Sequence, residues 1–173
     1  ALLRSAGLFS ALSCTALAEE TVYTNEVTHT DEPLRVALLV GLDGGIGSSG
    51  NLTAAERGVT DLAQALHSEG FSHITVLTGG DVTTEQVLKT LAQYESLRPE
   101  TAVAYVATHG ATCPIRDRKS VIHHLRTTET VVGGDCWDNT LTDEALIDGL
   151  KQLEARHSVL VIEACMTIFG TGG

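Results

Sequence analysis

The chain of 173 residues has few positive charges, few aromatic residues and only three prolines. Lysine and arginine number 11 against 22 aspartates and glutamates, which gives a formal net charge of −11. Such a chain lacks the cationic surface that phosphate backbones attract, so we expect no nucleic-acid partner. It also lacks any run of about 20 apolar residues, so we expect no membrane span. A hydrophobic content of 43% with 19% charged residues indicates one folded domain.

The N-terminal segment has the order of a secretory signal peptide. Arg4 precedes a short apolar run over residues 6–12, and Ala16-Leu17-Ala18 follows before two glutamates. This pattern predicts cleavage after Ala18 and export to the periplasm or the extracellular space. A helix docked on the domain and a lipoprotein box ending at Cys14 are the alternatives. The predicted organisation is a signal peptide over 1–18, an irregular lead-in over 19–33 and one folded domain over 34–173.

Export would determine which cysteines can form a disulfide. Cys14 leaves with the signal peptide, and the remaining three cysteines cannot all pair with one another. Cys113 and Cys136 lie in one polar stretch, where a disulfide could join them. Cys165 ends an apolar strand pattern that would hold it apart. In a reducing compartment all three would be thiols, so the sequence leaves the pairing open.

Apolar periodicity predicts strands that alternate with helices. Continuous apolar runs indicate strands buried on both faces, and apolar residues spaced by three and four indicate amphipathic helices. The first helix can be capped by Asn51 or Thr53. Residues 111–141 lack helical periodicity and indicate turns around a short hairpin at 120–125 and 130–132. We expect strands over 36–42, 73–78, 101–108 and 158–165, and helices over 51–69, 83–98 and 142–156. This order predicts an α/β fold with a mostly parallel sheet flanked by helices on both faces.

Two of the predicted strands end in residues suited to nucleophilic catalysis. His109 follows the third strand and Cys165 ends the fourth. The carboxyl ends of parallel strands meet at one edge of a sheet, and neighbouring strands lie about 4.8 Å apart. An imidazole can take the proton of a thiol near neutral pH, and the resulting thiolate is a strong nucleophile. The backbone N–H groups of Gly110 and Cys165 could stabilise an oxyanion, so the pattern predicts a Cys/His dyad.

The same segments resemble the two catalytic strand ends of the caspase-like cysteine peptidases, the group of caspases, metacaspases and legumains. They read Tyr-Val-Ala-Thr-His-Gly-Ala over 105–111 and Leu-Val-Ile-Glu-Ala-Cys over 160–165. The resemblance extends from about residue 34 to the end of the chain and implies a three-layer sandwich with endopeptidase activity. It implies that Cys165 is the nucleophile and that His109 is the general base or proton donor. The oxyanion hole would use the N–H groups of Gly110 and Cys165.

The resemblance also implies a substrate preference. Glu163 stands two residues before Cys165, where metacaspases and legumains line the primary specificity pocket with an acid. Together with Asp43, it would favour arginine or lysine before the cut, while an asparagine preference, as in legumains, is the alternative. After Cys165 the chain reads Met-Thr-Ile, where these branches usually have His-Ser-Gly or Glu-Ser-Gly. These families continue past this strand, so we expect a domain that is incomplete at its C-terminus.

Two other functions fit parts of the sequence. The glycines of residues 45–50 spell G-x-G-x-x-G after a strand, a pattern typical of Rossmann-type dinucleotide-binding oxidoreductases. The helix that follows is nevertheless expected to start after the last glycine, and Asp81 lies too far along to bind the ribose. The third possibility is an inactive caspase-like domain that serves as a binding scaffold.

A metal is not required by the predicted dyad, and we expect no obligate cofactor. Asp135, Asp138 and Asp143 offer oxygen ligands for calcium, which some metacaspases require, but a solvated polar loop is the interpretation we favour. We assign His123, His124 and His157 to the surface, because no second cysteine or acid stands at metal-ligand spacing from them.

Overall fold

The main sheet of the protein has five strands in the order β1-β3-β2-β4-β10. The computed structural model describes residues 21–24, 33–45, 50–114, 121–133 and 136–168. The predicted, mostly parallel α/β sheet is confirmed, because β1 alone runs antiparallel, paired with β3. The strands are β1 (Thr21–Thr24), β2 (Arg35–Gly41), β3 (His73–Thr78), β4 (Thr101–Ala107) and β10 (His157–Glu163).

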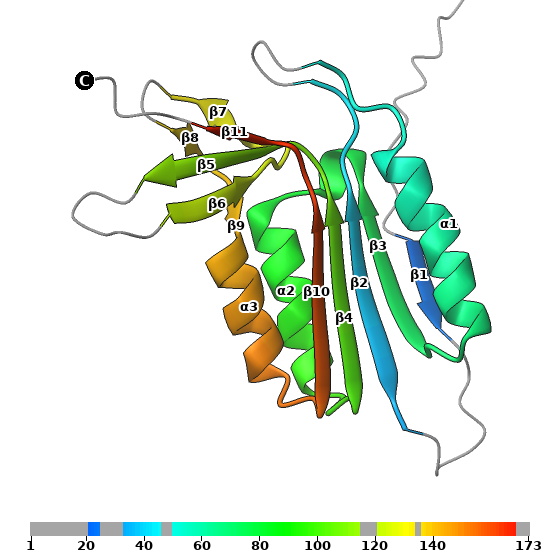
Figure 1. The fold of residues 1–173 in the computed structure, drawn as a ribbon. Helices are drawn as coiled ribbons and strands as arrows, with labels where there is room; N and C mark the ends of the chain where they lie inside the picture. Colours follow the sequence, from blue (N-terminus) through cyan, green and yellow to red (C-terminus); the bar gives the residue numbers. More distant parts are fainter. Residues whose placement is uncertain (1–20, 25–32, 46–49, 115–120, 134–135, 169–173) are drawn as a thin grey trace, which may run out of the picture.

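Helices cover both faces of this sheet, as predicted (Figure 1). Helix α1 (Ala55–Ser68) packs on one face, where Val59 and Ala63 are fully buried against β2 and β3. Helices α2 (Thr84–Glu95) and α3 (Asp143–Gln152) cover the other face, and the turn η1 (Gly79–Asp81) leads into α2. None of these helices, within the residues described, has the length and apolar character needed to cross a bilayer.

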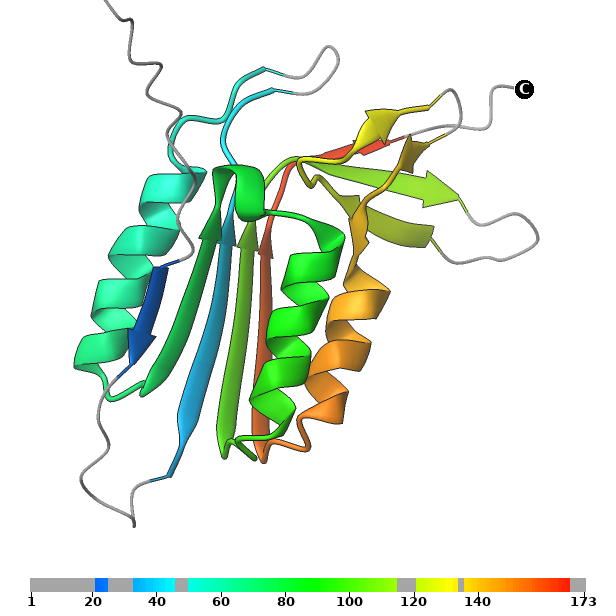
Figure 2. The ribbon, with the colours of Figure 1, turned by 180° about the vertical axis from the view of Figure 1, so that it is seen from behind.

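A smaller sheet projects from the carboxyl ends of the main strands (Figure 2). Its strand order is β11-β5-β6-β9, and a separate ribbon pairs β7 with β8. The predicted hairpin is therefore wrong, because β6 pairs with β5 and β9 and not with β7. Periodicity located these strands but carries no information about their partners. The elements are β5 (Gly110–Pro114), β6 (Val121–Leu125), β7 (Val131–Val132), β8 (Trp137–Asp138), β9 (Leu141–Thr142) and β11 (Met166–Ile168).

The two outer strands of the main sheet differ from expectation. The lead-in over 19–33, predicted to be irregular, contributes β1. Strand β10, predicted to be buried on both faces, forms the other edge of the sheet, and its Val159 and Val161 are 45% and 40% exposed. Helix α1 packs on β2, β3 and part of β4, and leaves β10 uncovered on that face. An edge strand can therefore carry the same apolar sequence as a central one.

Helix α1 begins later than predicted, and neither Asn51 nor Thr53 caps it. Its N-cap position is Ala54, which offers no side-chain hydrogen bond. The carboxylate of Asp43 supplies the cap instead, because Oδ1 accepts from the N–H groups of Ala55 at 2.7 Å and Glu56 at 3.4 Å. A residue in the turn after β2 thus fixes the start of the helix.

The cysteine pairing that the sequence left open is present in the structure. Cys113 on β5 and Cys136 before β8 form a disulfide, with their Cα atoms 5.8 Å apart. Cys165 is a free thiol, and it is exposed. The disulfide therefore joins two segments of the smaller sheet region and, among the cysteines that the structure describes, leaves the sulfur of Cys165 available for chemistry.

Replacing Gly41 should test how closely α1 approaches the sheet. A Cβ on Gly41 would lie 2.6 Å from the carbonyl oxygen of Ala55 and 2.7 Å from Cγ2 of Val59. Gly41→Ala should lower the free energy of unfolding by about 1–3 kcal/mol, because packed groups must shift. In the matched control Gly58→Ala, nothing lies within 4 Å of the added Cβ, and alanine should stabilise the helix by about 0.5–1 kcal/mol. Urea unfolding measures both, and equal midpoints would contradict the close approach.

Breaking the disulfide should cost stability. Cys136→Ser should lower the free energy of unfolding by about 3 kcal/mol in the chain-entropy estimate, because the bridge closes a loop between residues 23 apart. Cys165→Ser removes an exposed thiol and should change it little. Urea unfolding with and without a reductant measures the effect, and the reductant should weaken wild type but not Cys136→Ser. A wild type indifferent to reductant would contradict the bridge.

Candidate active site

His109 and Cys165 lie where two neighbouring strands pass together from the main sheet into the smaller one. Strand β4 continues as β5, and β10 continues as β11, with the two segments side by side (Figures 1 and 2). Partners in both ladders are 56 residues apart, and so are His109 and Cys165. The pairs that flank the crossing are Ala107 with Glu163 and Gly110 with Met166. The register is therefore unchanged across the crossing and sets His109 and Cys165 at matching positions.

Main-chain hydrogen bonds join the two segments through the crossing. The N–H of Thr108 donates to the carbonyl of Glu163 at 3.2 Å, and the N–H of Gly110 donates to the carbonyl of Cys165 at 3.3 Å. These bonds bracket His109 and tie its backbone directly to that of Cys165. The expectation that the two strand ends lie together is confirmed at the level of the backbone.

The imidazole of His109 contacts the turn after β2, on the other side of β4 from β10. The ring is buried, and its Nε2 lies 3.1 Å from the carbonyl oxygen of Gly44, in the turn after β2. A carbonyl oxygen only accepts, so Nε2 carries a proton in this contact. In the neutral ring the free lone pair is then on Nδ1, the nitrogen that could act as a base.

Arg126 connects the same turn to the segment that bears His109. Its N–H donates to the carbonyl of His109 at 2.9 Å, and its guanidinium Nη1 donates to the carbonyl of Asp43 at 2.9 Å. Partial burial lowers the pKa of Arg126 from its ordinary value. One residue at the end of β6 therefore positions both the histidine backbone and the turn that contacts its ring.

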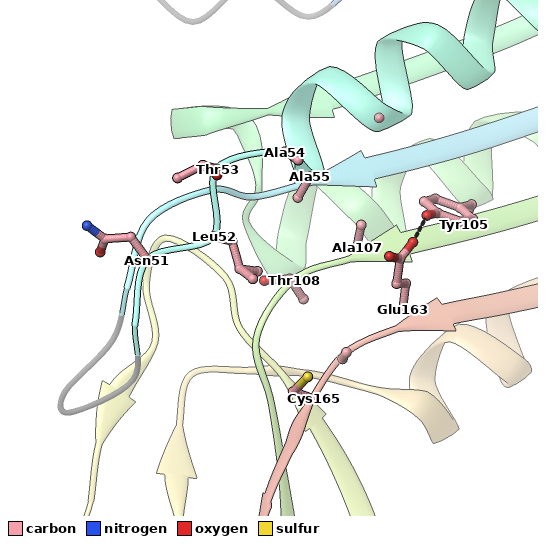
Figure 3. Close-up of a pocket in the computed structure, with 12 residues that line it drawn as sticks. Asn51, Leu52, Thr53, Ala54, Ala55, Tyr105, Ala107, Thr108, Glu163 and Cys165 are labelled. Atoms are coloured by element: carbon pink, nitrogen blue, oxygen red, sulfur yellow. Dashed lines mark hydrogen bonds between the residues drawn. The ribbon is translucent and has the colours of Figure 1, made fainter.

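Cys165 lies on a cleft of about 530 Å³ between the start of α1 and the ends of β4 and β10 (Figure 3). It sits two residues beyond the end of β10, in a short link before β11. The sequence predicted that Cys165 ends a buried strand. That prediction is wrong, because Cys165 is exposed. The cleft is lined by Asn51, Leu52, Thr53, Ala54, Ala55, Gly58, Tyr105, Ala107, Thr108, Glu163, Ala164 and Cys165.

Glu163 lies on the cleft wall, and Tyr105 of the adjacent strand donates its hydroxyl hydrogen to the glutamate Oε2 (Figure 3). The hydrogen bond to Glu163, the burial of the phenol and the negative charge of Glu163 raise the pKa of Tyr105 to about 12. Tyr105 therefore stays protonated and keeps donating throughout the neutral and mildly alkaline range.

The oxyanion role expected of Gly110 does not fit this conformation, because its N–H is bonded to the carbonyl of Cys165. Packing explains the glycine in another way. A Cβ at Gly110 would lie 3.0 Å from Cε and closer still to Sδ of Met166, and 3.1 Å from Cβ of Ala164. The absence of a side chain lets the segment after Cys165 run directly beside the segment after His109.

Asp43 does not join Glu163 on the cleft wall, although the resemblance put the two together. The residues that line the cleft do not include it, and its Oδ1 accepts the two N–H groups at the start of α1. The backbone N–H of Asp43 donates to Glu56 Oε1 at 3.3 Å. The carboxylate thus serves as a helix cap.

The same cap bears on the dinucleotide alternative. A pyrophosphate in a Rossmann site is held by the N–H groups at the start of a helix, and here Asp43 occupies those of α1. The helix begins at Ala55, five residues after Gly50, and residues 46–49 of the glycine motif lie outside the described residues. The N–H groups of Ala55 and Glu56, at the start of α1, are therefore already bonded within the protein, which counts against a phosphate site there.

One group of side chains could hold a metal ion by composition. Cys113, His124 and Cys136 place one ligand atom each within 4.8 Å of the others. The disulfide uses both sulfur atoms, so only the imidazole could ligate a cation in this state. Nδ1 of His124 lies 2.7 Å from Thr140 Oγ1, and burial lowers the pKa of His124. The sequence missed this grouping because its members come from three separate segments, β5, β6 and the residue before β8.

Two of the three aspartates considered for calcium, Asp138 and Asp143, are among the described residues, and neither belongs to a group of three possible metal ligands there. Asp143 binds His123, with its Oδ2 2.8 Å from Nδ1 and its Oδ1 accepting the histidine N–H at 3.2 Å. The same Oδ1 accepts the N–H of Glu144 at the start of α3. Asp138 is exposed, and Asp135 lies outside the described residues. The carboxylate of Asp143 therefore anchors β6 to α3.

Three residues around the site were not found from the sequence. Tyr105 lies on the face of β4 that lines the cleft. The one sequence feature that could have indicated it is a polar aromatic residue within a run of alanines and valines. Gly44 contacts the His109 ring through its backbone carbonyl. Arg126 contacts the His109 carbonyl through its backbone N–H and the Asp43 carbonyl through its side chain. No local pattern marks such contacts, because they depend on which loops meet.

Comparisons with known proteins support the fold and leave the family open. No family model matches the chain, and no curated protein matches it. Among solved structures, the chain is similar to protein GSU0716 from Geobacter sulfurreducens, with a TM-score of 0.61 and 21% sequence identity. The match covers 77% of this chain and 51% of that one, so the chain spans about half the length of this neighbour.

Removing the carboxylate of Glu163 should lower the pKa of Tyr105. In Glu163→Gln the pKa should fall from about 12 towards the ordinary value of 10.0, since the hydrogen bond to a carboxylate and its charge are both lost. Because the folded-state pKa is raised, the interaction stabilises the protein below pH 10 and is lost as the pH rises towards 12. Phenolate absorption during alkaline titration measures this, and superimposable titrations of the two proteins would contradict the contact.

Proposed function

We propose that the protein is a cysteine endopeptidase in which Cys165 is the nucleophile and His109 the general base. The observation that carries the proposal is the constant register through the crossing, which sets the backbone of Cys165, an exposed free thiol, beside the backbone of His109. The cleft of about 530 Å³ beside the thiol has the volume of a small-molecule or peptide side-chain site. The resemblance to the caspase-like peptidases implies the same reaction.

The proposed chemistry uses the thiol of Cys165 and the imidazole of His109, whose backbones lie side by side at the crossing. Nδ1 of His109 takes the proton of the Cys165 thiol, and the thiolate attacks the carbonyl carbon of the scissile peptide bond. The imidazolium then gives that proton to the leaving amine, which leaves a thioester on Cys165. Water, deprotonated by His109, hydrolyses the thioester and restores the thiol. The carbonyl of Gly44 holds the ring in the required tautomer, because it accepts from Nε2.

The oxyanion that forms during attack needs backbone donors. The N–H of Cys165 is the proposed donor, since it belongs to the nucleophile itself. The N–H of Gly110 could join only by leaving the carbonyl of Cys165, a bond whose 3.3 Å length is slightly beyond the usual range of about 2.7–3.2 Å. The carbonyl oxygen of the substrate would then replace the carbonyl oxygen of Cys165 as the acceptor of this N–H.

The substrate preference proposed for this cleft is a basic residue before the cut. Among the described residues that line the cleft, Glu163 is the only one with a charged side chain, and it lies two residues from Cys165. A carboxylate at this position attracts arginine or lysine and disfavours acidic side chains.

Export is proposed as well, with residues 1–18 as its signal. The Cys113–Cys136 disulfide supports an oxidising compartment, where such bonds persist. The signal segment itself lies outside the described residues.

An electrophilic peptide probe tests the peptidase proposal. A chloromethyl ketone with arginine at its reactive end should alkylate Cys165, as located by mass spectrometry, and block cleavage of a matching peptide amide. His109→Ala should reduce kcat/KM by about 10²–10⁴-fold, because the base is lost. His157→Ala is the matched control, since that histidine is exposed at the far end of β10.

Two results would go against the peptidase. In the first, the arginine probe labels Cys165 no faster than iodoacetamide does, once both rates are corrected for the intrinsic reactivity of each reagent towards a free thiol. Such a result would indicate that Cys165 reacts only because it is exposed. The other is a folded protein that binds peptides without cutting them, which would favour the binding scaffold.

A further inference from the structure

Tyr105 and Glu163 share one face of the main sheet at the cleft. Tyr105 pairs in register with Val161 on β10, and Glu163 lies two residues further along β10, opposite Ala107. Side chains two apart on a strand point to the same face, so the phenol and the carboxylate are diagonal neighbours. Figure 3 shows the hydroxyl directed at the carboxylate on the cleft wall.

We propose that Tyr105 is a specificity-determining residue, which together with Glu163 forms a two-acceptor site that selects a guanidinium over an ammonium group. The inference rests on the proposed function and narrows its substrate class from basic residues to arginine.

The hydrogen-bond inventory of the pair supports this selection. The phenol hydrogen is directed to Glu163 Oε2, so the phenol oxygen keeps its lone pairs and the carboxylate keeps Oε1. Within the described residues, no other hydrogen bond to either of these atoms is found. A guanidinium presents five N–H donors in a planar fork and can bond Oε1 and the phenol oxygen together. An ammonium is a compact point charge that gains mainly from the carboxylate.

The rest of the cleft favours a long side chain. Four of the other lining residues are small and leave room for the long side chain of arginine; they are Ala54, Ala55 and Gly58 around the start of α1, and Ala107, the register partner of Glu163. Glu163 is separated from Cys165 by one residue, so a side chain attached beside the attacked carbonyl can extend back along β10 to the carboxylate. The raised pKa of Tyr105 keeps the phenol neutral, so it adds no second negative charge that would attract lysine equally.

Steady-state kinetics on two peptides that differ only in arginine or lysine before the cut test the inference. Wild type should prefer arginine, and Tyr105→Phe should lower kcat/KM for the arginine peptide by about tenfold through KM, with little change for lysine. The preference should not vary with pH across the neutral and mildly alkaline range. Tyr94→Phe is the matched control, because it removes a buried hydroxyl bonded to Ala37 and Thr75 in the core.

A binding measurement separates this inference from the peptidase proposal. Calorimetry of Cys165→Ala with the methylamides of N-acetylarginine and N-acetyllysine should show about tenfold tighter arginine binding, which Tyr105→Phe abolishes. Cleavage with an unchanged arginine preference in Tyr105→Phe would overturn the role of Tyr105 and leave the peptidase intact. Arginine-selective binding without cleavage would support Tyr105 and remove the peptidase. Equal binding of the two ligands by the wild-type cleft would overturn the inference.

Discussion

The parallel register between β4 and β10 is the constraint on which the candidate site depends. The two strands stay in step while they leave the main sheet and pair again as β5 and β11. Cross-strand hydrogen bonds hold both sides of the crossing, so the residues between them cannot slide past each other. A slip of one residue would turn every side chain of β10 to the opposite face and would carry Glu163 off the cleft wall.

The turn after β2 connects three parts of the molecule that the sequence keeps far apart. The side chain of Asp43 caps α1, its carbonyl accepts from Arg126, and the neighbouring carbonyl of Gly44 contacts His109. Helix, smaller sheet and candidate base are thereby joined through one turn. This explains why Asp43, whose charge suggests substrate binding, has a mainly structural place, and why the α1 N-terminus is occupied by the protein itself.

The cleft exists because the helix layer is unequal on the two faces of the main sheet. In the part of the chain that the structure describes, α2 and α3 cover one face, whereas α1 lies on the other and does not reach over β10 (Figures 1 and 2). The uncovered face carries Tyr105 and Glu163 next to the exposed thiol. A polar pair that would be costly in a closed interior is accommodated here, since the carboxylate keeps access to water.

The amino-acid sequence is enough to predict the alternating order of elements, the buried central strands and the two strand ends that carry His109 and Cys165. These features depend on local periodicity and on the rule that parallel strands end at one edge. Tertiary structure alone decided that β10 is an edge, that β6 pairs with β5 and β9, and that the N–H of Gly110 is bonded to Cys165. It also decided the partners of Tyr105 and Arg126. Such contacts join atoms distant in the chain, so they depend on which surfaces meet when the elements pack, and no spacing along the sequence encodes that.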